Sequence, residues 1–151
     1  AGVAGGLSDQ VAVGSAFWIE AVATPEGPWE PLRPPSSPFR RLCTVNQVLT
    51  SPTQRRLLHE ATGADLVDLE GAHFVRTCRT LGVPCSIIRG VSDGVDDLLP
   101  ANCERLIDER GRTDLTAVLK HLVRSPGQIP ALLRLGRRTA RAMAAVTAAL
   151  E

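Results

Sequence analysis

Two carboxylate side chains, those of Glu70 and Asp93, each follow an apolar run of the sequence and could do chemistry there. Two carboxylic acids at one site can divide labour when their surroundings keep one protonated and the other ionised. The protonated group then acts as a general acid, and the ionised group accepts hydrogen bonds. Cleavage of a glycosidic bond needs this division, because the leaving group takes up a proton while the sugar hydroxyls are held.

The segment from residue 64 to residue 97 must position these two groups, and its pattern predicts a strand, a helix and a second strand. Such a unit makes its two strands parallel, so that their carboxyl ends meet at one edge of the sheet. Open α/β folds bind ligands at that edge, and we therefore expect Glu70 and Asp93 to share one crevice. The predicted strands are residues 64–69 and 85–91, and the predicted helix is residues 71–81, with an apolar stripe at Phe74, Cys78 and Leu81.

Each carboxylate also has a purely structural explanation, and both explanations stay open. Glu70 stands at the first turn of a helix, where the helix dipole favours negative charge. Asp93 precedes a glycine, where an aspartate commonly forms an Asx-turn. The neighbouring Arg89 is interpreted as a structural ion-pair partner, for Asp96 or Asp97.

The rest of the chain predicts an α/β fold with a mixed or mostly parallel sheet. Six prolines exclude regular structure from residues 24–38. Ser51 followed by Pro52, and then Gly63, mark the start and the end of one helix. Further strands are predicted at residues 11–13, 16–23 and 40–45, and further helices at residues 98–111, 114–124 and 129–151.

Composition excludes several classes of protein. The chain has 151 residues, enough for about one domain, and a net charge of +1 that favours neither nucleic acid nor a membrane. Aromatic residues make up 3%, with no Tyr, so that base-stacking platforms for nucleic acid are not expected. The four cysteines form no C-x-x-C pair, and no metal site is expected. Without a membrane-spanning run or a signal peptide, the expected location is the cytoplasm.

Three motifs resemble those of the nucleoside phosphorylase and nucleosidase superfamily. They are VDLEGA (67–72), VPCSIIRGVSDGVDD (83–97) and the glycine-rich GVAGGL (2–7). The resemblance implies a three-layer phosphorylase-like fold, in which helices flank a mixed central sheet. Residues 111–142 resemble the C-terminal extension of hopanoid-biosynthesis-associated nucleoside phosphorylases, which implies the conversion of adenosylhopane to ribosylhopane, or its phosphate, and adenine.

The resemblance also assigns roles to residues of the site. Asp93 would be catalytic, protonating or hydrogen-bonding N7 of the leaving adenine, and Glu70 would bind the ribose 2′- and 3′-hydroxyls. No cofactor is implied, although inorganic phosphate would be the co-substrate if the reaction is a phosphorolysis. The other implied substrate-binding residues are Leu69 under the sugar, Ser92 beside Asp93, Val48 and Leu49 against the purine, and Gly5 and Gly6 through their backbone.

Two departures from the family pattern qualify this expectation. Val3 replaces the family's Ser or Thr in the glycine-rich loop, and the family's N-terminal half is missing from the sequence. We therefore expect residues 1–124 to be the C-terminal portion of the domain, followed by a helical basic and apolar tail at 125–151, and the chain to be inactive alone. A catalytically inactive nucleoside-binding or interaction module, and an enzyme like methylthioadenosine/adenosylhomocysteine nucleosidase, are the alternatives.

The expected partner is a small nucleoside with an apolar 5′ group, and no nucleic acid. The full-length protein is expected to be a homo-oligomer. For the tail, peripheral contact with an anionic membrane is one reading, and a solvated or packing helix is the other.

Overall fold

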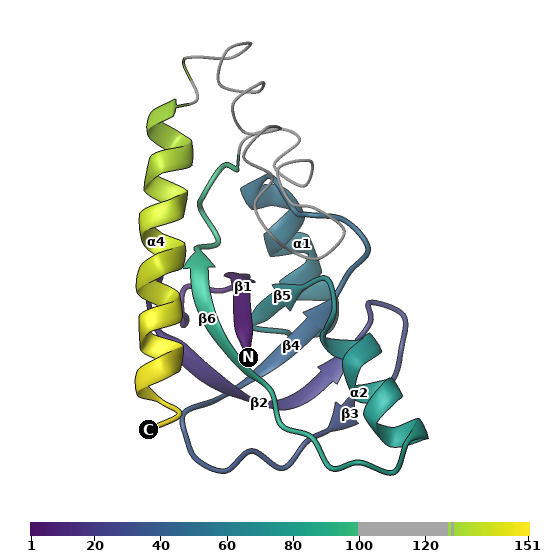
Figure 1. Ribbon diagram of the computed structural model, residues 1–151. Coiled ribbons are helices and arrows are strands. Elements are labelled where there is room, and N and C mark those ends of the chain that lie inside the picture. Colours follow the sequence, from purple (N-terminus) through teal and green to yellow (C-terminus); the bar gives the residue numbers. More distant parts are fainter. Residues whose placement is uncertain (100–126, 128) are drawn as a thin grey trace.

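The computed structural model describes residues 1–99, 127 and 129–151, and Figure 1 shows their arrangement. The described residues form strands and helices in a mixed order, as the sequence predicts. The strands are β1 (Gly2–Gly6), β2 (Ala16–Ala23), β3 (Glu30–Pro31), β4 (Phe39–Thr44), β5 (Leu66–Asp68) and β6 (Ile88–Asp93). The helices are α1 (Pro52–Thr62), α2 (Gly71–Thr80) and α4 (Ile129–Ala148).

The strands form one mixed sheet in the order β3-β2-β4-β5-β1-β6. β2, β4 and β5 run parallel to one another, and β1 is antiparallel to β5 but parallel to β6. The start of β2 also pairs with β6 in the antiparallel sense, so that the sheet curls and closes on itself. The predicted mixed sheet with flanking helices is confirmed, and the closure is a feature that the sequence pattern does not show.

Each helix covers a different apolar cluster of the sheet. Neighbouring residues of a strand point to opposite faces, so that one strand serves two clusters. The α2 side is built on a cluster that contains Leu42 and Leu66, whereas the next residues along the same strands, Cys43 and Val67, belong to the cluster beneath α1. On the α4 side the buried cluster is Trp18, Ile88 and Val146.

The expected parallel arrangement of the strands on either side of α2 is wrong. β1 lies between β5 and β6, and because it is antiparallel to β5 and parallel to β6, these two strands run in opposite directions. The segment that connects α2 to β6, residues 81–87, contains neither helix nor strand (Figure 1). The crossover rule concerns parallel strands of one sheet, and it does not apply to β5 and β6 because they run in opposite directions.

Other local expectations also need correction. Residues 24–38, which were expected to hold no regular structure, contain the two-residue strand β3, which pairs with β2. Residues 11–13 form turns and loop rather than a strand, although Val11 is buried. Of the predicted apolar stripe of α2, only Cys78 is buried. Phe74 lies on the exposed side of the helix, and Leu81 follows the helix and is also exposed. The buried positions of α2 are Gly71, Ala72, Val75 and Cys78. The helices predicted between residues 100 and 124 and the proposed boundary after residue 124 lie outside the described residues.

The two ends of α1 follow their sequence signals. Ser51 caps the helix and forms a reciprocal capping box with Gln54, and Pro52 occupies the first turn. Gly63 ends the helix with φ +67°, a left-handed conformation that glycine adopts without the strain of a side chain. The two ends of α1 are therefore fixed largely by local sequence.

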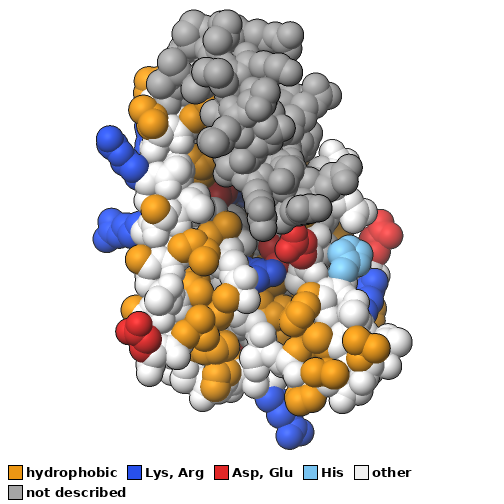
Figure 2. All heavy atoms as spheres, in the orientation of Figure 1, with side chains coloured by type: hydrophobic (Ala, Val, Ile, Leu, Met, Phe, Trp, Pro, Cys, Tyr) orange, Lys and Arg blue, Asp and Glu red, His pale blue; other side chains and the backbone are white. Residues whose placement is uncertain are grey.

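Helix α4 lies along β6 and packs closely against it (Figure 1). Gly90 makes this approach possible, because a Cβ atom there would lie 2.5 Å from the carbonyl oxygen of Ala142. Ala142 and Val146 are buried in this helix, whereas Leu133 and Met143 are exposed. Figure 2 shows apolar side chains along this helix, with basic side chains projecting from its outer side. Among the described residues, no helix is both long enough and apolar enough to cross a membrane.

Candidate active site

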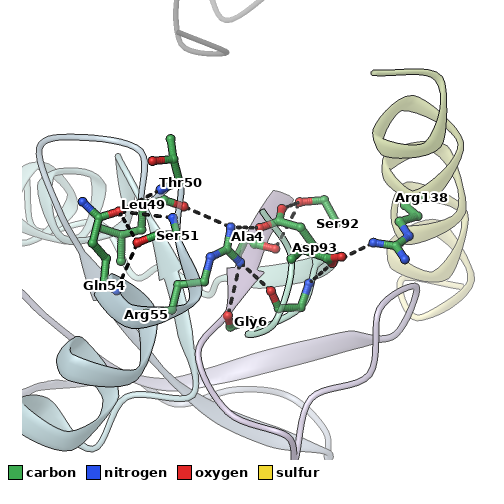
Figure 3. A network of polar contacts seen from close by, with 12 residues as sticks. Ala4, Gly6, Leu49, Thr50, Ser51, Gln54, Arg55, Ser92, Asp93 and Arg138 are labelled. Carbon is green, nitrogen blue, oxygen red and sulfur yellow. Dashed lines mark hydrogen bonds and ion pairs between the residues drawn. The ribbon is translucent and has the colours of Figure 1, made fainter. Parts of the chain in front are cut away.

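Asp93, the predicted catalytic residue, ends β6 with its side chain almost completely buried. Its Oδ2 atom lies 2.5 Å from Nη2 of Arg55, a residue of α1. Its Oδ1 atom accepts a 2.5 Å hydrogen bond from the hydroxyl of Ser92, and Figure 3 shows this arrangement. Asp93 is therefore half of a buried ion pair in which both carboxylate oxygens have a partner, rather than the head of an Asx-turn.

The glycine-rich strand β1 passes directly beside this carboxylate. Gly5 is the register partner of Asp93, and a Cβ atom at Gly5 would lie 2.9 Å from Oδ2 of Asp93 and 3.3 Å from Nη1 of Arg55. The carbonyl oxygen of Gly6 accepts a hydrogen bond of 3.4 Å from the same Nη1 atom. Only a residue without a side chain permits this approach. The structure thus brings together four of the predicted site residues: Gly5, Gly6, Ser92 and Asp93.

Leu49 belongs to the same group through its backbone. Its carbonyl oxygen accepts a hydrogen bond of 3.1 Å from Nη2 of Arg55, and its side chain packs on the apolar cluster beneath α1. Val48, the preceding residue, is half-buried. The predicted contact of Val48 and Leu49 with a purine stays a prediction, and Leu49 is positioned close to the Arg55–Asp93 pair.

Glu70 and Leu69 lie in the turn between β5 and α2. The Glu70 side chain is exposed and makes no capping hydrogen bond to α2, and Leu69 is 42% exposed. Because β5 and β6 run in opposite directions, their carboxyl ends do not meet at one edge of the sheet. The topological reason for placing Glu70 and Asp93 in one crevice is therefore wrong.

Asp68, the last residue of β5, holds the turn that carries Glu70. Its buried carboxylate accepts hydrogen bonds of 3.0 and 2.7 Å from Nε and Nη2 of Arg89. It also accepts a 2.7 Å hydrogen bond from the Thr44 hydroxyl and hydrogen bonds from the backbone N–H groups of Gly71 and Glu70. The backbone of Glu70 is consequently tied to a buried ion pair.

Arg89 does not pair with Asp96 or Asp97, so its predicted partners are wrong. The antiparallel course of β5 and β6 places the start of β6 near the end of β5, and Arg89 therefore reaches Asp68. Asp96 pairs instead with Arg56 at the surface.

Asp97 lies just beyond Asp93 and links the site to α4. Its Oδ2 atom accepts hydrogen bonds of 2.7 Å from the Gly94 N–H and 2.7 Å from Nη1 of Arg138. Burial by itself would raise the pKa of Asp97, but these hydrogen bonds and the charges of Arg138 and Arg55 outweigh it and lower the pKa below its usual value. The charged form of Asp97 is therefore the one that the fold stabilises.

Cys43 lies in β4 with its side chain fully buried. Burial, and then the negative charge of Asp68, raise the pKa of the Cys43 thiol to about 11. A thiol with this pKa stays protonated at neutral pH and is a poor nucleophile. Cys43 is therefore a packing residue of the sheet.

A hollow of about 250 Å³ is lined by α1 and by the segment that follows β1. It contains none of the predicted site residues in its wall. The residues that line it are Leu7, Ser8, Asp9, Gln10, Arg56, His59 and Glu60.

Sequence reasoning missed two groups at the site, Arg55 and the Asp68–Thr44 pair. Arg55 is the buried residue of α1, in a helix whose other positions are half-buried or exposed. Its spacing to Leu58 and Thr62, at i+3 and i+7, would have placed it on the inner side of the helix. Asp68 ends β5 directly after the buried apolar residues Leu66 and Val67, and an acidic residue in such a buried strand is a sign of a paired charge.

Known proteins resemble this chain in sequence and in fold. The sequence model of the Phosphorylase superfamily matches residues 35–124, more than half of the chain. Aminodeoxyfutalosine nucleosidase of Helicobacter pylori (strain J99) is 26% identical over 72 residues, which cover 48% of this chain and 31% of that protein. The chain thus matches less than a third of the length of this curated relative.

Two solved structures show the similarity of fold. Futalosine hydrolase of Helicobacter pylori strain 26695 matches with a TM-score of 0.53 and 20% identity, over 64% of this chain and 54% of that one. The 5′-methylthioadenosine/S-adenosyl homocysteine nucleosidase of Campylobacter jejuni matches with a TM-score of 0.59 and 16% identity, over 69% of this chain and 58% of that one. With the family match over residues 35–124, these findings confirm what the three motifs imply: the chain belongs to the phosphorylase superfamily.

Proposed function

We propose that this chain supplies the base-binding and ribose-binding part of a site that cleaves the N-glycosidic bond of an adenine nucleoside. The observation that carries the proposal is the buried Asp93 carboxylate, held by Arg55 and Ser92 beside the side-chain-free strand at Gly5 and Gly6. Membership of the phosphorylase superfamily and the nucleosidases among the similar proteins support it.

The chemistry assigns one task to each end of the nucleoside. As the bond from the base nitrogen to C1′ of the ribose breaks, its electron pair goes to the base and positive charge develops on the sugar. Asp93 would stabilise the departing base by a hydrogen bond or a proton at N7, and Glu70 would hold the ribose hydroxyls. Water or inorganic phosphate then adds to C1′, so that phosphate is the co-substrate in the second case. Leu69, Val48 and Leu49 would pack against the sugar and the base.

Binding of adenine by the purified chain tests the proposal most directly. Calorimetry is expected to show binding by the wild type and a loss of about tenfold or more for Asp93→Asn, because the carboxyl group that would contact the base is removed. Asp96→Asn is the matched control, since Asp96 is an exposed carboxylate in the same loop, paired with Arg56. Absence of adenine binding by the wild type would overturn the proposal.

We propose further that the 5′ substituent of the substrate is apolar, as in adenosylhopane. The half-buried Val48 and Leu49 support this, because they offer apolar surface and Leu49 contacts Arg55 through its backbone. In a series of 5′-alkylthioadenosines, affinity is expected to rise by about fourfold for each buried CH₂ group. Affinity that is greatest for 5′-methylthioadenosine would favour the alternative, a substrate like that of the methylthioadenosine nucleosidases.

A second candidate function is a nucleoside-binding module without catalysis. It is supported by Val3, which brings no hydroxyl to β1, and by the engagement of both Asp93 oxygens within the chain. Incubation of the chain with adenosine, with and without phosphate, separates the two functions. Binding of adenine without release of adenine from adenosine supports the module, whereas release in proportion to enzyme concentration supports the enzyme.

The exposed side of α4 could contact an anionic membrane, where a lipid substrate would be found. Leu133 and Met143 are exposed there, with Arg134 and Arg137 on the same helix. Removal of α4 is a poor test, because it would uncover the cluster that contains Val146. Flotation with phosphatidylglycerol vesicles is expected to be lost in Arg134→Glu/Arg137→Glu. We also propose that the full-length protein is a homo-oligomer, which light scattering of that protein without vesicles would test.

A further inference from the structure

The side chain of Arg55 is only 1% exposed, whereas the other residues of α1 are exposed or half-buried. A buried guanidinium is costly unless its N–H groups and its charge find partners. Its partners therefore show what the fold uses this residue for.

Four contacts of the Arg55 guanidinium reach three segments around the proposed site: the end of β6, the end of β1 and the segment that precedes α1 (Figure 3). Nη2 contacts the carboxylate of Asp93 at 2.5 Å and the carbonyl oxygen of Leu49 at 3.1 Å. Nη1 donates to the carbonyl oxygens of Gly94 at 2.8 Å and of Gly6 at 3.4 Å. The planar, five-donor guanidinium is suited to fix several acceptors at once, which the compact ammonium of lysine is not.

We propose that Arg55 is a positioning residue that acts on the ligand through Asp93. Together with the Ser92 hydroxyl on Oδ1, it fixes the plane of the Asp93 carboxyl group, so that the remaining lone pairs of this group are presented to an N–H group of adenine. The contacts to Leu49 and Gly6 set the distance between this carboxylate and the segments on either side of it. This inference rests on the proposed function, since it concerns how the same site holds adenine.

A merely structural role makes a different prediction. If Arg55 only tied the carbonyl groups of Leu49, Gly6 and Gly94 together, its loss would weaken adenine binding to the same degree whether or not residue 93 carried a carboxylate. If it acts through Asp93, its loss should have no further effect once that carboxylate is gone. A double-mutant cycle on adenine affinity separates the two.

The experiment compares wild type, Arg55→Met, Asp93→Asn and the double variant by calorimetry with adenine, with folding checked by circular dichroism. Arg55→Met is expected to weaken adenine binding at least about tenfold in the wild-type background and less than about twofold in the Asp93→Asn background. Arg56→Met is the matched control, because Arg56 is the next residue of α1, is exposed and pairs with Asp96. It should bind adenine as the wild type does.

Arg55→Lys keeps the test decisive if Arg55→Met does not fold, because lysine returns the charge to Asp93 without the fork that fixes the carboxylate plane. Its affinity is expected to lie between those of the wild type and Asp93→Asn. Wild-type affinity in a folded Arg55→Lys or Arg55→Met, or an equal loss in both backgrounds of the cycle, would overturn the inference and leave the proposed function intact. Failure of both variants to fold would assign Arg55 to the fold and also contradict the inference. No binding by the wild type would instead overturn the proposed function and the inference with it.

Discussion

The guanidinium of Arg55 and the carboxylate of Asp93 form a buried ion pair that joins α1 to the end of β6. The sheet leaves room for the pair because Gly5, the residue beside it on β1, has no side chain. A charge pair at this depth is unusual in a small domain, and in this chain it coincides with the residues that the family motifs single out. The strands and α1 together thus hold the candidate site.

Gly5→Ala should impair the site rather than the fold as a whole. The new methyl group would lie 2.9 Å from the Asp93 carboxylate, so that the carboxylate must move away from its position. We expect adenine affinity to fall by about tenfold or more, with a smaller change in thermal stability. Gly136→Ala is the control, since nothing lies within 4 Å of a Cβ atom at that position. Unchanged adenine affinity in Gly5→Ala would contradict this close approach.

Gly90→Ala should loosen α4. A Cβ atom at this position would collide with the backbone of Ala142, which cannot rotate away as a side chain can. Amide hydrogen exchange around Ala142 and Val146 is expected to accelerate, and the midpoint of thermal unfolding to fall. By contrast, Gly136→Ala in the same helix should stabilise the protein by up to about 1 kcal/mol, because alanine favours the helical state. Equal effects of the two substitutions would argue against the packing of α4 on β6.

Arg89→Met should destabilise the protein strongly. It leaves the Asp68 carboxylate buried without its charge partner, which costs about 3–5 kcal/mol. The comparison is Arg56→Met, which removes a surface pair with Asp96 and should cost about 0–1 kcal/mol. Urea denaturation of the two variants measures both free energies of unfolding. Similar values would show that the Asp68–Arg89 pair is not buried as described.

Asp97 should make the protein less stable as the pH falls. Because its pKa is lower in the folded state than in the unfolded state, folding binds fewer protons at this residue. The stabilisation is present above the unfolded pKa and is lost as the pH falls through the folded pKa. Arg138→Met should reduce this part of the pH dependence, as thermal melts at a series of acidic pH values would show, whereas Arg137→Met should leave it unchanged. An identical pH dependence in Arg138→Met and the wild type would contradict the Asp97–Arg138 contact.

Cys43 should resist alkylation in the folded protein. Its thiol is buried and its pKa is raised to about 11, so that little thiolate is present at pH 8. Mass spectrometry after iodoacetamide treatment is expected to find Cys43 unmodified in the native chain and modified in urea. Labelling of Cys43 at equal rates in both conditions would show that β4 opens readily.

Local sequence determined most of the elements and the identity of the family. Ser51, Pro52 and Gly63 mark the ends of α1 because capping and a left-handed residue depend only on neighbouring residues. The motif at residues 83–97 carried the resemblance because its residue types and spacing are properties of the sequence alone. These signals act over a few residues, and they do not depend on which strands become neighbours.

The tertiary structure decided how those elements meet. β1 lies between β5 and β6, so that the two strands run in opposite directions, Arg89 reaches Asp68, and Glu70 and Asp93 do not share one sheet edge. Strand order is a choice among distant segments that all carry similar apolar runs, and the sequence pattern of one segment does not show which neighbour it takes. For the same reason the pairing of Arg55 with Asp93 became visible only when α1 was placed on the sheet. The position of a charged residue in a helix predicts which face of the helix it lies on, but not which residue it pairs with.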